Sequence, residues 1–134
     1  MTSGVKCSEA CLAKFNELKL KKTCRFILYK IENKEQIVID KIGDRECTFD
    51  QFKELLENLE NEARYAVLDF EPDNCHSQLL FISWIPDNAN VRERMLYASS
   101  VDALKRQLTG FKGYIQLNDK SDLTAENFLD KLKY

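Results

Sequence analysis

The sequence predicts an α/β domain in which helices cover both faces of a central β-sheet. Two short apolar runs, Arg64–Phe70 and Gln78–Trp84, have the length and composition of strands that are buried on both faces, and such strands need helices above and below them. Stretches with helical spacing precede and follow this pair of runs. The 134 residues correspond to one domain, 1–134, and no internal repeat or proline-rich linker divides it.

Local signals place the other elements in chain order. Ser8 can cap a first helix, because its side chain can accept a hydrogen bond from the backbone of the following turn. The β-branched and aromatic runs 25–31 and 36–42 flank a short polar segment, which indicates a hairpin or two adjacent strands. Thr48 and Gln51 have the spacing of a capping box. The expected elements are a helix from residue 8 to about 20, strands at 25–31 and 36–42, a helix after Thr48, the two central strands, a helix within 86–110, a strand near 114–117 and a final helix from Thr124 to about 133.

The stretch 86–110 is predicted to form a helix with two faces of different character. At about 100° per residue, one stripe is apolar or small and is predicted to face the core, whereas the side opposite Leu104 carries a methionine among small and polar residues. The core stripe consists of Tyr97, Ser100, Val101, Leu104 and Leu108, extended by Phe111; the outer face consists of Val91, Met95, Ala98, Ser99 and Asp102, with Arg92, Arg94, Lys105 and Arg106 at its edges.

The outer face of this helix has the composition of a protein-binding surface. A flexible, apolar methionine beside small residues, ringed by arginines and turned away from the core, is suited to a helix that lies in a groove of another protein. The alternative is that Met95 is a single exposed apolar residue on a charged helix, which is common in soluble proteins. Periodicity by itself leaves both interpretations open.

Composition excludes several classes of protein. Charges of both signs are dispersed and the net charge is −2, so no basic field is available to hold nucleic acid, and no nucleic-acid partner is expected. No apolar run follows the initial methionine and none approaches the roughly 18 residues of a membrane span, so neither a secretory signal nor a transmembrane segment is expected. The sequence therefore predicts a cytoplasmic protein, and we expect a monomer.

The sequence contains few residue patterns that would indicate a metal, cofactor or catalytic site. The five cysteines are odd in number and contain no C-x-x-C pair, so we expect reduced thiols rather than a disulfide framework or a zinc site. Cys7 and Cys11 are four residues apart and could share a helix face, but a metal site would need further ligands. The single histidine, His76, lies next to Cys75 without a residue that would orient either side chain. No glycine-rich phosphate loop is present. We expect no enzymatic activity, no cofactor and no metal.

Four motifs, in the same order as in a known family, cover the chain from residue 3 to about residue 133. The most specific motif begins at the end of the second central strand and continues through the helix with two faces. The matching residues are Ser3-Gly4-Val5; Phe15-Asn16-Glu17-Leu18-Lys19-Leu20; Tyr65-Ala66-Val67-Leu68-Asp69-Phe70; and Trp84, Pro86-Asp87, Val91-Arg92, Met95-Leu96-Tyr97-Ala98-Ser99-Ser100 and Asp102-Ala103-Leu104. In these residues the chain resembles the actin-depolymerizing factor/cofilin family, and in its short length the members from apicomplexan parasites.

The resemblance implies the actin-depolymerizing factor homology (ADF-H) fold, a central mixed β-sheet sandwiched between α-helices. It also implies a non-catalytic protein of the actin cytoskeleton that binds ADP-actin monomers, promotes filament depolymerization and turnover, and alters nucleotide exchange on actin. The monomer-binding site that it implies is formed by the N-terminal segment and the outer face of the long helix. Its residues are Ser3, Gly4, Val5, Arg92, Arg94, Met95, Ser99 and Asp102.

The chain departs from the family at a second actin-contacting surface, which serves filament binding. Family members that sever filaments have a projecting loop between the central strands, basic residues at the start of the second strand and a charged C-terminal helix. Here the loop spans only 71–77, and His76 and Gln78 stand where basic residues are expected. Asp130 and Lys131 match the expected acid–base pair, but the chain stops where a further basic residue would come. We expect weak filament binding, modest severing and a preference for monomers.

Basic residues lead to one further expectation. Basic residues at the end of the first helix are stabilised by the negative end of the helix dipole, so their presence does not by itself indicate a bound ligand. The resemblance implies that phosphoinositides inhibit actin binding. The tentative phosphoinositide residues are Lys19, Lys21, Lys22, Arg94, Lys105 and Arg106.

Two alternative functions stay open. One is a glia maturation factor-like regulator of branched actin networks, against which Ser3-Gly4-Val5 and Met95 argue. The other is a phosphoinositide-binding module whose actin contact is secondary.

A negative charge at Ser3 is predicted to weaken actin binding. The resemblance implies that the segment around Ser3 contacts actin and is inactivated by phosphorylation, and a phosphate adds about −1.5 to −2 charge next to an acidic partner. Ser3→Glu should therefore bind monomeric actin more weakly than Ser3→Ala in a fluorescence titration. Equal affinities of the two variants would mean that Ser3 is a tail residue without a charge-sensitive contact.

Overall fold

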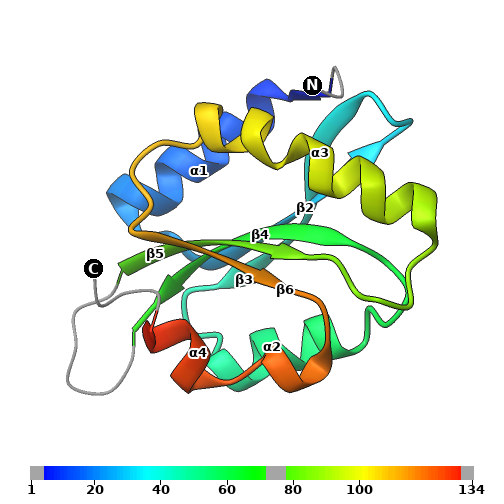
Figure 1. Cartoon of the computed structure of the whole chain (residues 1–134). Helices are drawn as coiled ribbons and strands as arrows, with labels where there is room; N and C mark the ends of the chain where they lie inside the picture. Colours follow the sequence, from blue (N-terminus) through cyan, green and yellow to red (C-terminus); the bar gives the residue numbers. More distant parts are fainter. Residues whose placement is uncertain (1–4, 72–77, 131–134) are drawn as a thin grey trace.

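Within the described residues, 5–71 and 78–130, the computed structural model contains one mixed sheet of six strands (Figure 1). The outer pairs β1–β3 and β5–β6 are parallel, and the inner neighbours are antiparallel. In sheet order the strands are β1 (Lys6–Cys7), β3 (Gln36–Asp44), β2 (Cys24–Glu32), β4 (Arg64–Phe70), β5 (Gln78–Trp84) and β6 (Gly113–Leu117). The predicted α/β class with a central mixed sheet is confirmed.

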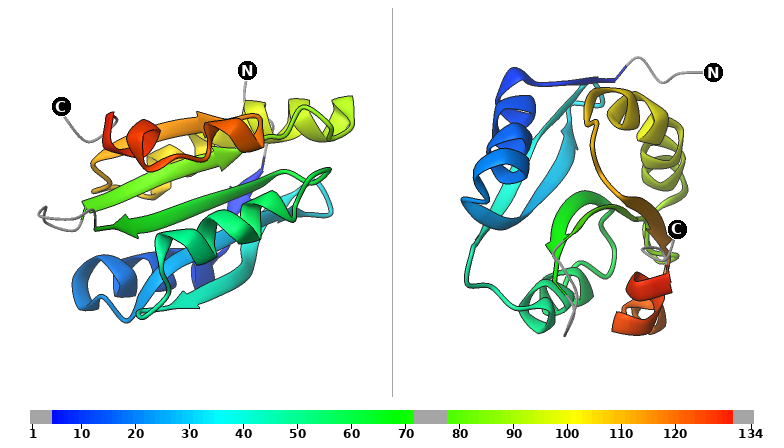
Figure 2. Two further views of the ribbon diagram at one scale, coloured as in Figure 1. Left: turned by 90° about the horizontal axis from the view of Figure 1, so that it is seen from below. Right: turned by 90° about the vertical axis from the view of Figure 1, so that its left-hand side faces the viewer.

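Helices form a layer on each face of the sheet (Figures 1 and 2). The α1 helix (Glu9–Lys21) and the α3 helix (Val91–Gln107) cover one face, and α2 (Phe49–Glu57) and α4 (Ala125–Asp130) cover the other. A 3-10 turn, η1 (Lys120–Asp122), precedes α4. Two hydrophobic clusters result, one between each helical layer and the sheet.

Side chains that alternate between the two faces of the sheet divide the core into its two clusters. Side chains of β2 point in turn to the two faces, so Ile27 and Tyr29 join the cluster under α1 and α3, whereas Phe26 and Leu28 join the cluster over α2 and α4. In β4 and β5 every residue after the first is buried, as predicted for central strands. The indole of Trp84 donates a hydrogen bond to the carbonyl of Leu59 at 2.9 Å, which ties β5 to the chain that follows α2.

Side-chain caps begin the predicted helices. Ser8 accepts a hydrogen bond from the Cys11 N–H, and Thr48 and Gln51 form both bonds of the capping box. The open choice at 33–34 is settled as a hairpin, because β2 and β3 pair in antiparallel fashion up to Glu32 and Gln36. In the three-residue connection between them, Asn33 and Lys34 both have positive φ and the Glu35 N–H donates to the Glu32 carbonyl at 3.1 Å, as in a tight turn between twisted strands.

Two features differ from the sequence-based expectations, and one expected boundary is not tested. The long helix begins at Val91 rather than within 86–90, because Pro86 and Ala89 close a turn and Asn90 caps the helix. Strand β1 was not predicted, and it places Cys7 in the sheet, so the expectation that Cys7 and Cys11 share a helix face is wrong. The last helix is described as far as Asp130, and the rest of the predicted range to 133 lies outside the described residues.

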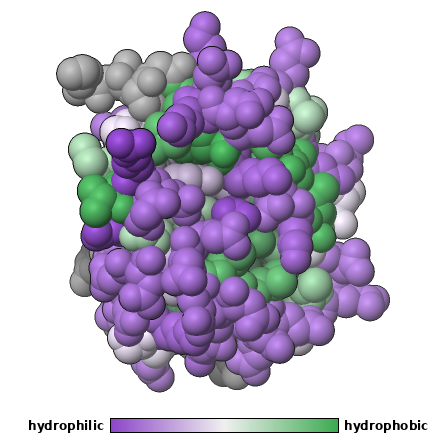
Figure 3. All heavy atoms as spheres, turned by 90° about the vertical axis from the view of Figure 1, so that its right-hand side faces the viewer, coloured by the Kyte–Doolittle hydropathy of each residue, from purple (hydrophilic) through white to green (hydrophobic). Residues whose placement is uncertain are grey.

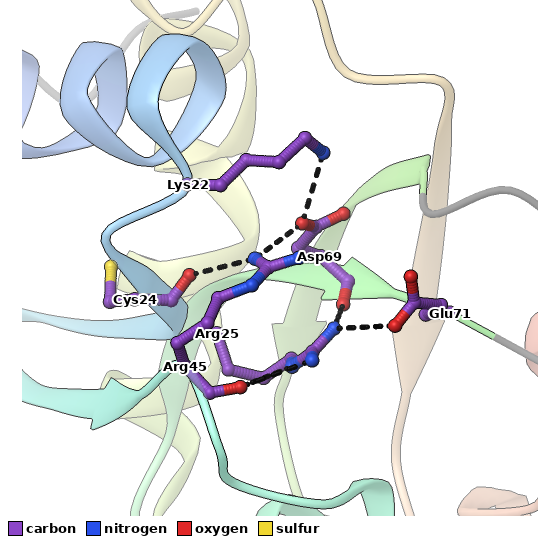
Figure 4. A network of polar contacts seen from close by, with 6 residues as sticks. All are labelled: Lys22, Cys24, Arg25, Arg45, Asp69 and Glu71. Carbon is purple, nitrogen blue, oxygen red and sulfur yellow. Dashed lines mark hydrogen bonds and ion pairs between the residues drawn. The ribbon is translucent and has the colours of Figure 1, made fainter.

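A buried carboxylate joins four segments at the end of β4 (Figure 4). The side chain of Asp69 is 1% exposed, and its Oδ2 accepts a hydrogen bond from Arg45 at 2.6 Å and lies 3.3 Å from the Lys22 ammonium. Arg45 also donates to the carbonyl of Cys24 at 3.1 Å. The carboxylate therefore connects the end of α1, the start of β2 and the segment after β3 to β4.

Arg25 completes this network through backbone groups. Its guanidinium donates to the carbonyl of Asp69 at 3.1 Å and twice to the carbonyl of Arg45, at 3.1 and 3.2 Å. Glu71 lies 3.7 Å from the same guanidinium, and its side chain is half exposed. Because Arg25 is mostly buried, it holds the end of β4 in place rather than presenting a free charge at the surface.

Removal of Arg45 is predicted to destabilise the fold more than removal of Lys22. Arg45→Met leaves a buried carboxylate with one half-exposed cation, and we expect the free energy of unfolding to fall by about 3 kcal/mol. Lys22→Met should cost under about 1 kcal/mol, because that ion pair is solvated on one side. Urea denaturation measures both.

The double variant Arg45→Met/Asp69→Leu tests the cause. It should be more stable than Arg45→Met alone, because no unpaired charge then remains buried. Equal unfolding midpoints for wild type and Arg45→Met would contradict the role assigned to this pair.

Candidate functional site

Two tyrosines fix the inner face of α3 to the sheet. The hydroxyl of buried Tyr97 accepts a hydrogen bond from the Ile31 N–H of β2 at 2.9 Å. Tyr65 of β4 donates its hydroxyl to the Tyr97 carbonyl, and the two rings lie 5.1 Å apart between centroids. Burial raises the pKa of both phenols, so both stay neutral in the physiological range. Tyr97, Val101 and Leu104 are buried on this side, as the periodicity predicts.

The outer face of α3 is exposed, as predicted. Met95 is 66% exposed and Val91 is 59% exposed, and both are large apolar side chains on the surface. Arg92, Ala98, Ser99, Asp102 and Arg106 are also exposed, whereas Arg94 and Lys105 at the edges are half buried. The structure thus brings the predicted outer residues onto one continuous helical surface.

The start of α3 is held by polar contacts. Asn90 accepts a hydrogen bond from the Glu93 N–H at 2.8 Å, and the Glu93 carboxylate accepts one from the Ala63 N–H, just before β4, at 2.5 Å. Arg94 donates from Nε to the carbonyl of Ala89 at 3.1 Å. The guanidinium of Arg94 is therefore partly immobilised, and Arg92 is the more exposed of the two arginines.

Two hollows flank the ridge formed by Val91 and Met95. One, of about 280 Å³, lies between α3 and the end of the sheet; the other, of about 760 Å³, lies between α3 and the β2–β3 hairpin. Figure 3 views the side on which α3 begins, where hydrophobic patches alternate with a hydrophilic surround. The smaller hollow is lined by Ile85, Asp87, Val91, Arg94, Met95, Ala98, Gln116 and Asn118, and the larger by Ile31, Asn33, Lys34, Asn90, Val91, Arg92, Glu93, Leu96 and Tyr97.

Sequence reasoning missed the residues that line these hollows from other elements. Gln116 is exposed between buried Ile115 and Leu117, and this alternation is a signal that could have placed it on the outer side of β6. Asn118 is fixed by a hydrogen bond from its amide to the carbonyl of Ile85 at 2.9 Å. That contact joins residues 33 positions apart in the sequence, so no local sequence pattern predicts it.

The N-terminal segment enters beside α3. Val5 is buried in the same cluster as Tyr97, and β1 contacts α3. The Lys6 N–H donates to the carbonyl of Glu35 at 3.1 Å, which places this edge next to the β2–β3 hairpin. Ser3 and Gly4 lie outside the described residues, so their place in the predicted site stays a prediction.

Two of the predicted filament-binding residues, Gln78 and Asp130, are described, and they lie at the other end of the central strands. Gln78 opens β5 opposite Phe70, and the Phe70 ring packs in a tilted arrangement against Phe128 of α4, with centroids 5.7 Å apart. Asp130 is exposed on the same short helix. Gln78 is half buried, and its carbonyl oxygen has no hydrogen-bond partner among the described residues. His76 and Lys131 lie outside the described residues.

The predicted phosphoinositide residues do not form one cluster. Lys19 donates to the carbonyl of Thr109 at 3.1 Å, so the ends of α1 and α3 meet. Lys105 lies over the ring of Tyr114 at 3.9 Å, and Lys22 is paired with Asp69. Lys21 and Arg106 are exposed. Arg94 is eleven residues before Lys105, roughly 16 Å along the helix, and is therefore remote from the others.

Other classes of site are not supported in the part of the chain that the structure describes. No group of three or more histidine, cysteine or acidic side chains there could hold a metal ion. None of the described helices is long and apolar enough to cross a membrane.

The fold is an α/β domain whose α3 helix presents an exposed apolar ridge with basic edges at the surface. The chain matches the family described as "Cofilin/tropomyosin-type actin-binding protein" over residues 4–133, and it belongs to this actin-depolymerizing factor/cofilin family. It is 43% identical over 129 residues to actin-depolymerizing factor 10 of Arabidopsis thaliana, covering 92% of this chain and 91% of that protein.

Solved structures agree with this assignment. The crystal structure of Streptomyces griseoflavus cofilin superposes with a TM-score of 0.87 at 38% identity, covering 97% of this chain and all of that one. Plasmodium berghei actin depolymerization factor 2 superposes with a TM-score of 0.84 at 30% identity, covering 100% of both chains. The predicted ADF-H fold and family resemblance are confirmed.

Proposed function

We propose that this protein binds actin monomers through the outer face of α3 and promotes depolymerization and turnover of actin filaments, without catalysis of its own. Its family and the names of its relatives, which are actin-depolymerizing factors, support this function. The single observation that carries it is the exposure of Met95 on a helix whose inner face is fixed by buried tyrosines.

The proposed interface has an apolar centre and a charged edge. Met95 and Val91 form the ridge that enters an apolar groove of actin, and the small residues Ala98 and Ser99 let the helix approach closely. Arg92 and Arg94 meet acidic groups at the rim of that groove. The two hollows beside the ridge accept side chains from the partner.

Several finer properties belong to the same proposal. We assign a preference for ADP-actin monomers over filaments, altered nucleotide exchange on actin, and modest severing. The weak point of the filament-binding surface is Gln78, a neutral and half-buried side chain where the family pattern has a cation. Asp130 is exposed and supports residual filament contact. The proposed location is the cytoplasmic actin cytoskeleton, with a monomeric protein.

A phosphoinositide-binding role is the second candidate, because the ends of α1 and α3 bring cations together. Lys19, Lys21, Lys105 and Arg106 lie on these converging ends, whereas Arg94 is remote. Sedimentation with liposomes that contain phosphoinositides, run beside actin pelleting, separates a lipid-binding module from an actin-binding one. A glia maturation factor-like protein would instead act on branched networks without binding monomers tightly.

Truncation of the ridge is predicted to remove monomer binding and leave the fold intact. Met95→Ala with Arg92→Ala should lose roughly 1–3 kcal/mol of binding free energy from the methionine alone, since an exposed anchor leaves no cavity when it is shortened. A fluorescence titration with actin monomers and a thermal melt measure the two effects.

Matched variants separate the interface from the core. Leu20→Ala removes an apolar side chain that is 76% exposed on α1, and it should change neither actin affinity nor the melt. Tyr97→Ala and Leu104→Ala should each lower stability by about 2–5 kcal/mol. Unchanged actin affinity of the Met95/Arg92 variant, with an unchanged melt, would overturn the proposed interface.

Restoring cations at the filament-binding surface is predicted to strengthen filament binding. His76→Lys with Gln78→Lys supplies the charges expected opposite an acidic filament, and monomer binding should not change because α3 lies elsewhere. Co-sedimentation with filaments, compared with monomer titration, measures this. Stoichiometric decoration of filaments by the wild-type protein at low concentration would show that the surface is not weak.

A further inference from the structure

The larger of the two hollows beside α3 has walls from two separate parts of the chain. One wall is formed by the first two turns of α3, with Val91 and Leu96, and the other by the β2–β3 hairpin, with Ile31 and Lys34. Figure 3 shows hydrophobic surface among hydrophilic side chains on the side where α3 begins. The volume of about 760 Å³ lies within the range of roughly 300–1,000 Å³ that is typical of pockets for small organic ligands.

Both walls of this hollow are held in place by the fold. Tyr97 of α3 also lines the hollow, and its hydroxyl accepts the Ile31 N–H of β2 at 2.9 Å, so this side chain ties the helix to the hairpin. At the end of the hairpin, Asn33 and Lys34 both have positive φ, as in a tight turn. The hollow is therefore formed before a ligand arrives, and binding loses little free energy to the ordering of its walls.

Aliphatic side chains give the hollow an apolar interior. Ile31 and Leu96 line it and are partly buried against the core cluster under α3. Val91 lines it as well and is 59% exposed, so its apolar surface is open to a ligand. An apolar ligand body that fills the hollow removes this surface from water, and burial of apolar surface is the main favourable contribution to binding in such pockets.

The rim of the hollow is positively charged. Lys34 lines it from the hairpin and Arg92 from the helix, and both are exposed without an ion pair to any described residue. Glu93 also lines the hollow, but its carboxylate is engaged by a backbone N–H just before β4, at 2.5 Å. Glu32 and Glu35 of the hairpin are not among the lining residues. Two available cations on opposite walls favour an anionic group on the ligand.

We propose that this hollow binds a small carboxylate with an apolar body, of the arylalkanoate class, and that the bound ligand competes with actin monomers. The aryl group fills the aliphatic interior, and the carboxylate lies at the rim between Lys34 and Arg92. The first half rests on the hollow alone. The second half rests on the proposed function, because Val91 and Arg92 line the hollow and also belong to the helix face proposed to bind actin.

Three probes with the same apolar body test the preference for a carboxylate. 3-Phenylpropionate, 3-phenylpropanol and 3-phenylpropylammonium share a phenyl ring and a three-carbon chain and differ in the terminal group. The carboxylate should shift the amide signals of Ile31, Lys34 and Leu96 in nitrogen-15-labelled protein, with a Kd on the order of a millimolar for a ligand of this size. The alcohol should bind about tenfold more weakly, and the ammonium should produce no shift at these residues.

Lys34→Asn tests the rim without disturbing the turn. Asparagine tolerates positive φ better than lysine does, so the hairpin should be kept, and a thermal melt checks this. Loss of the cation should weaken binding of the carboxylate about threefold and leave binding of the alcohol unchanged. Lys41→Asn is the matched control, because Lys41 is also an exposed lysine but lies roughly 20 Å farther along β3, and it should change neither affinity.

Three results would overturn the site. One is that the carboxylate and the alcohol bind equally well, because the charged rim then plays no part. Another is that the carboxylate shifts amide signals elsewhere, for example those of Ala98 and Gln116 in the smaller hollow, and not those of Ile31, Lys34 and Leu96. The third is that no signal of the hollow shifts when the carboxylate is raised to about ten times the expected Kd.

Actin titration tests the competition. With 3-phenylpropionate at about ten times its Kd, the wild-type protein should bind actin monomers about tenfold more weakly than without it. The same concentration should weaken actin binding of Lys34→Asn less, which controls for any effect of the probe on actin itself. Unchanged actin affinity of protein whose hollow is occupied would overturn the competition. Failure of the ligand-free protein to bind actin would instead refute the proposed function, while the amide shifts still decide the ligand site.

Discussion

The attachment of α3 to the sheet by Tyr65 and Tyr97 is the constraint on which the proposed interface depends. Tyr97 faces inward because its hydroxyl accepts the Ile31 N–H and its carbonyl accepts the Tyr65 hydroxyl. A helix repeats its faces every 3.6 residues, so fixing Tyr97 inward turns Met95 outward. The exposure of Met95 is thus a consequence of buried hydrogen bonds and packing rather than a local accident of the surface.

Strand β4 positions both proposed actin-contacting surfaces. Its start lies beside α3, through Tyr65 and the contact between Ala63 and Glu93. Its end carries Asp69, which is held by Arg45 from the segment after β3 and by Lys22 from the end of α1. One strand therefore positions the helix proposed to bind monomers at one end, and at the other end it leads toward the residues proposed to contact filaments.

Local patterns predicted what depends on local geometry. The two faces of α3 and the caps at Ser8 and Thr48 follow from helical spacing and from side chains within one turn, and the structure confirms them. Strand β1 escaped prediction because two residues have no periodicity and exist as a strand only through pairing with β3. For the same reason the placement of Cys7 on a helix was wrong.

Long-range contacts account for the rest. The pairing of Lys22 with Asp69 spans 47 residues, so no local pattern could show that this exposed cation faces a buried carboxylate. The hollows beside the ridge of Val91 and Met95 are lined by segments that meet only in the folded chain, so the sequence could identify the ridge but not its surroundings. Helical spacing alone left Met95 open between a binding anchor and a stray surface residue, and exposure of the whole face with flanking hollows favours the anchor.

The central claim is that Met95 contacts actin, and the methyl signal of Met95 tests it most directly. With carbon-13 methyl labels on methionine and leucine, a titration with monomeric actin reports on Met95 and on exposed Leu20 of α1 at once. The account predicts that the Met95 methyl signal shifts or broadens at substoichiometric actin while the Leu20 signals change only with the overall size of the complex. An unaltered Met95 signal in a formed complex, or a specific change at Leu20 in its place, would contradict it.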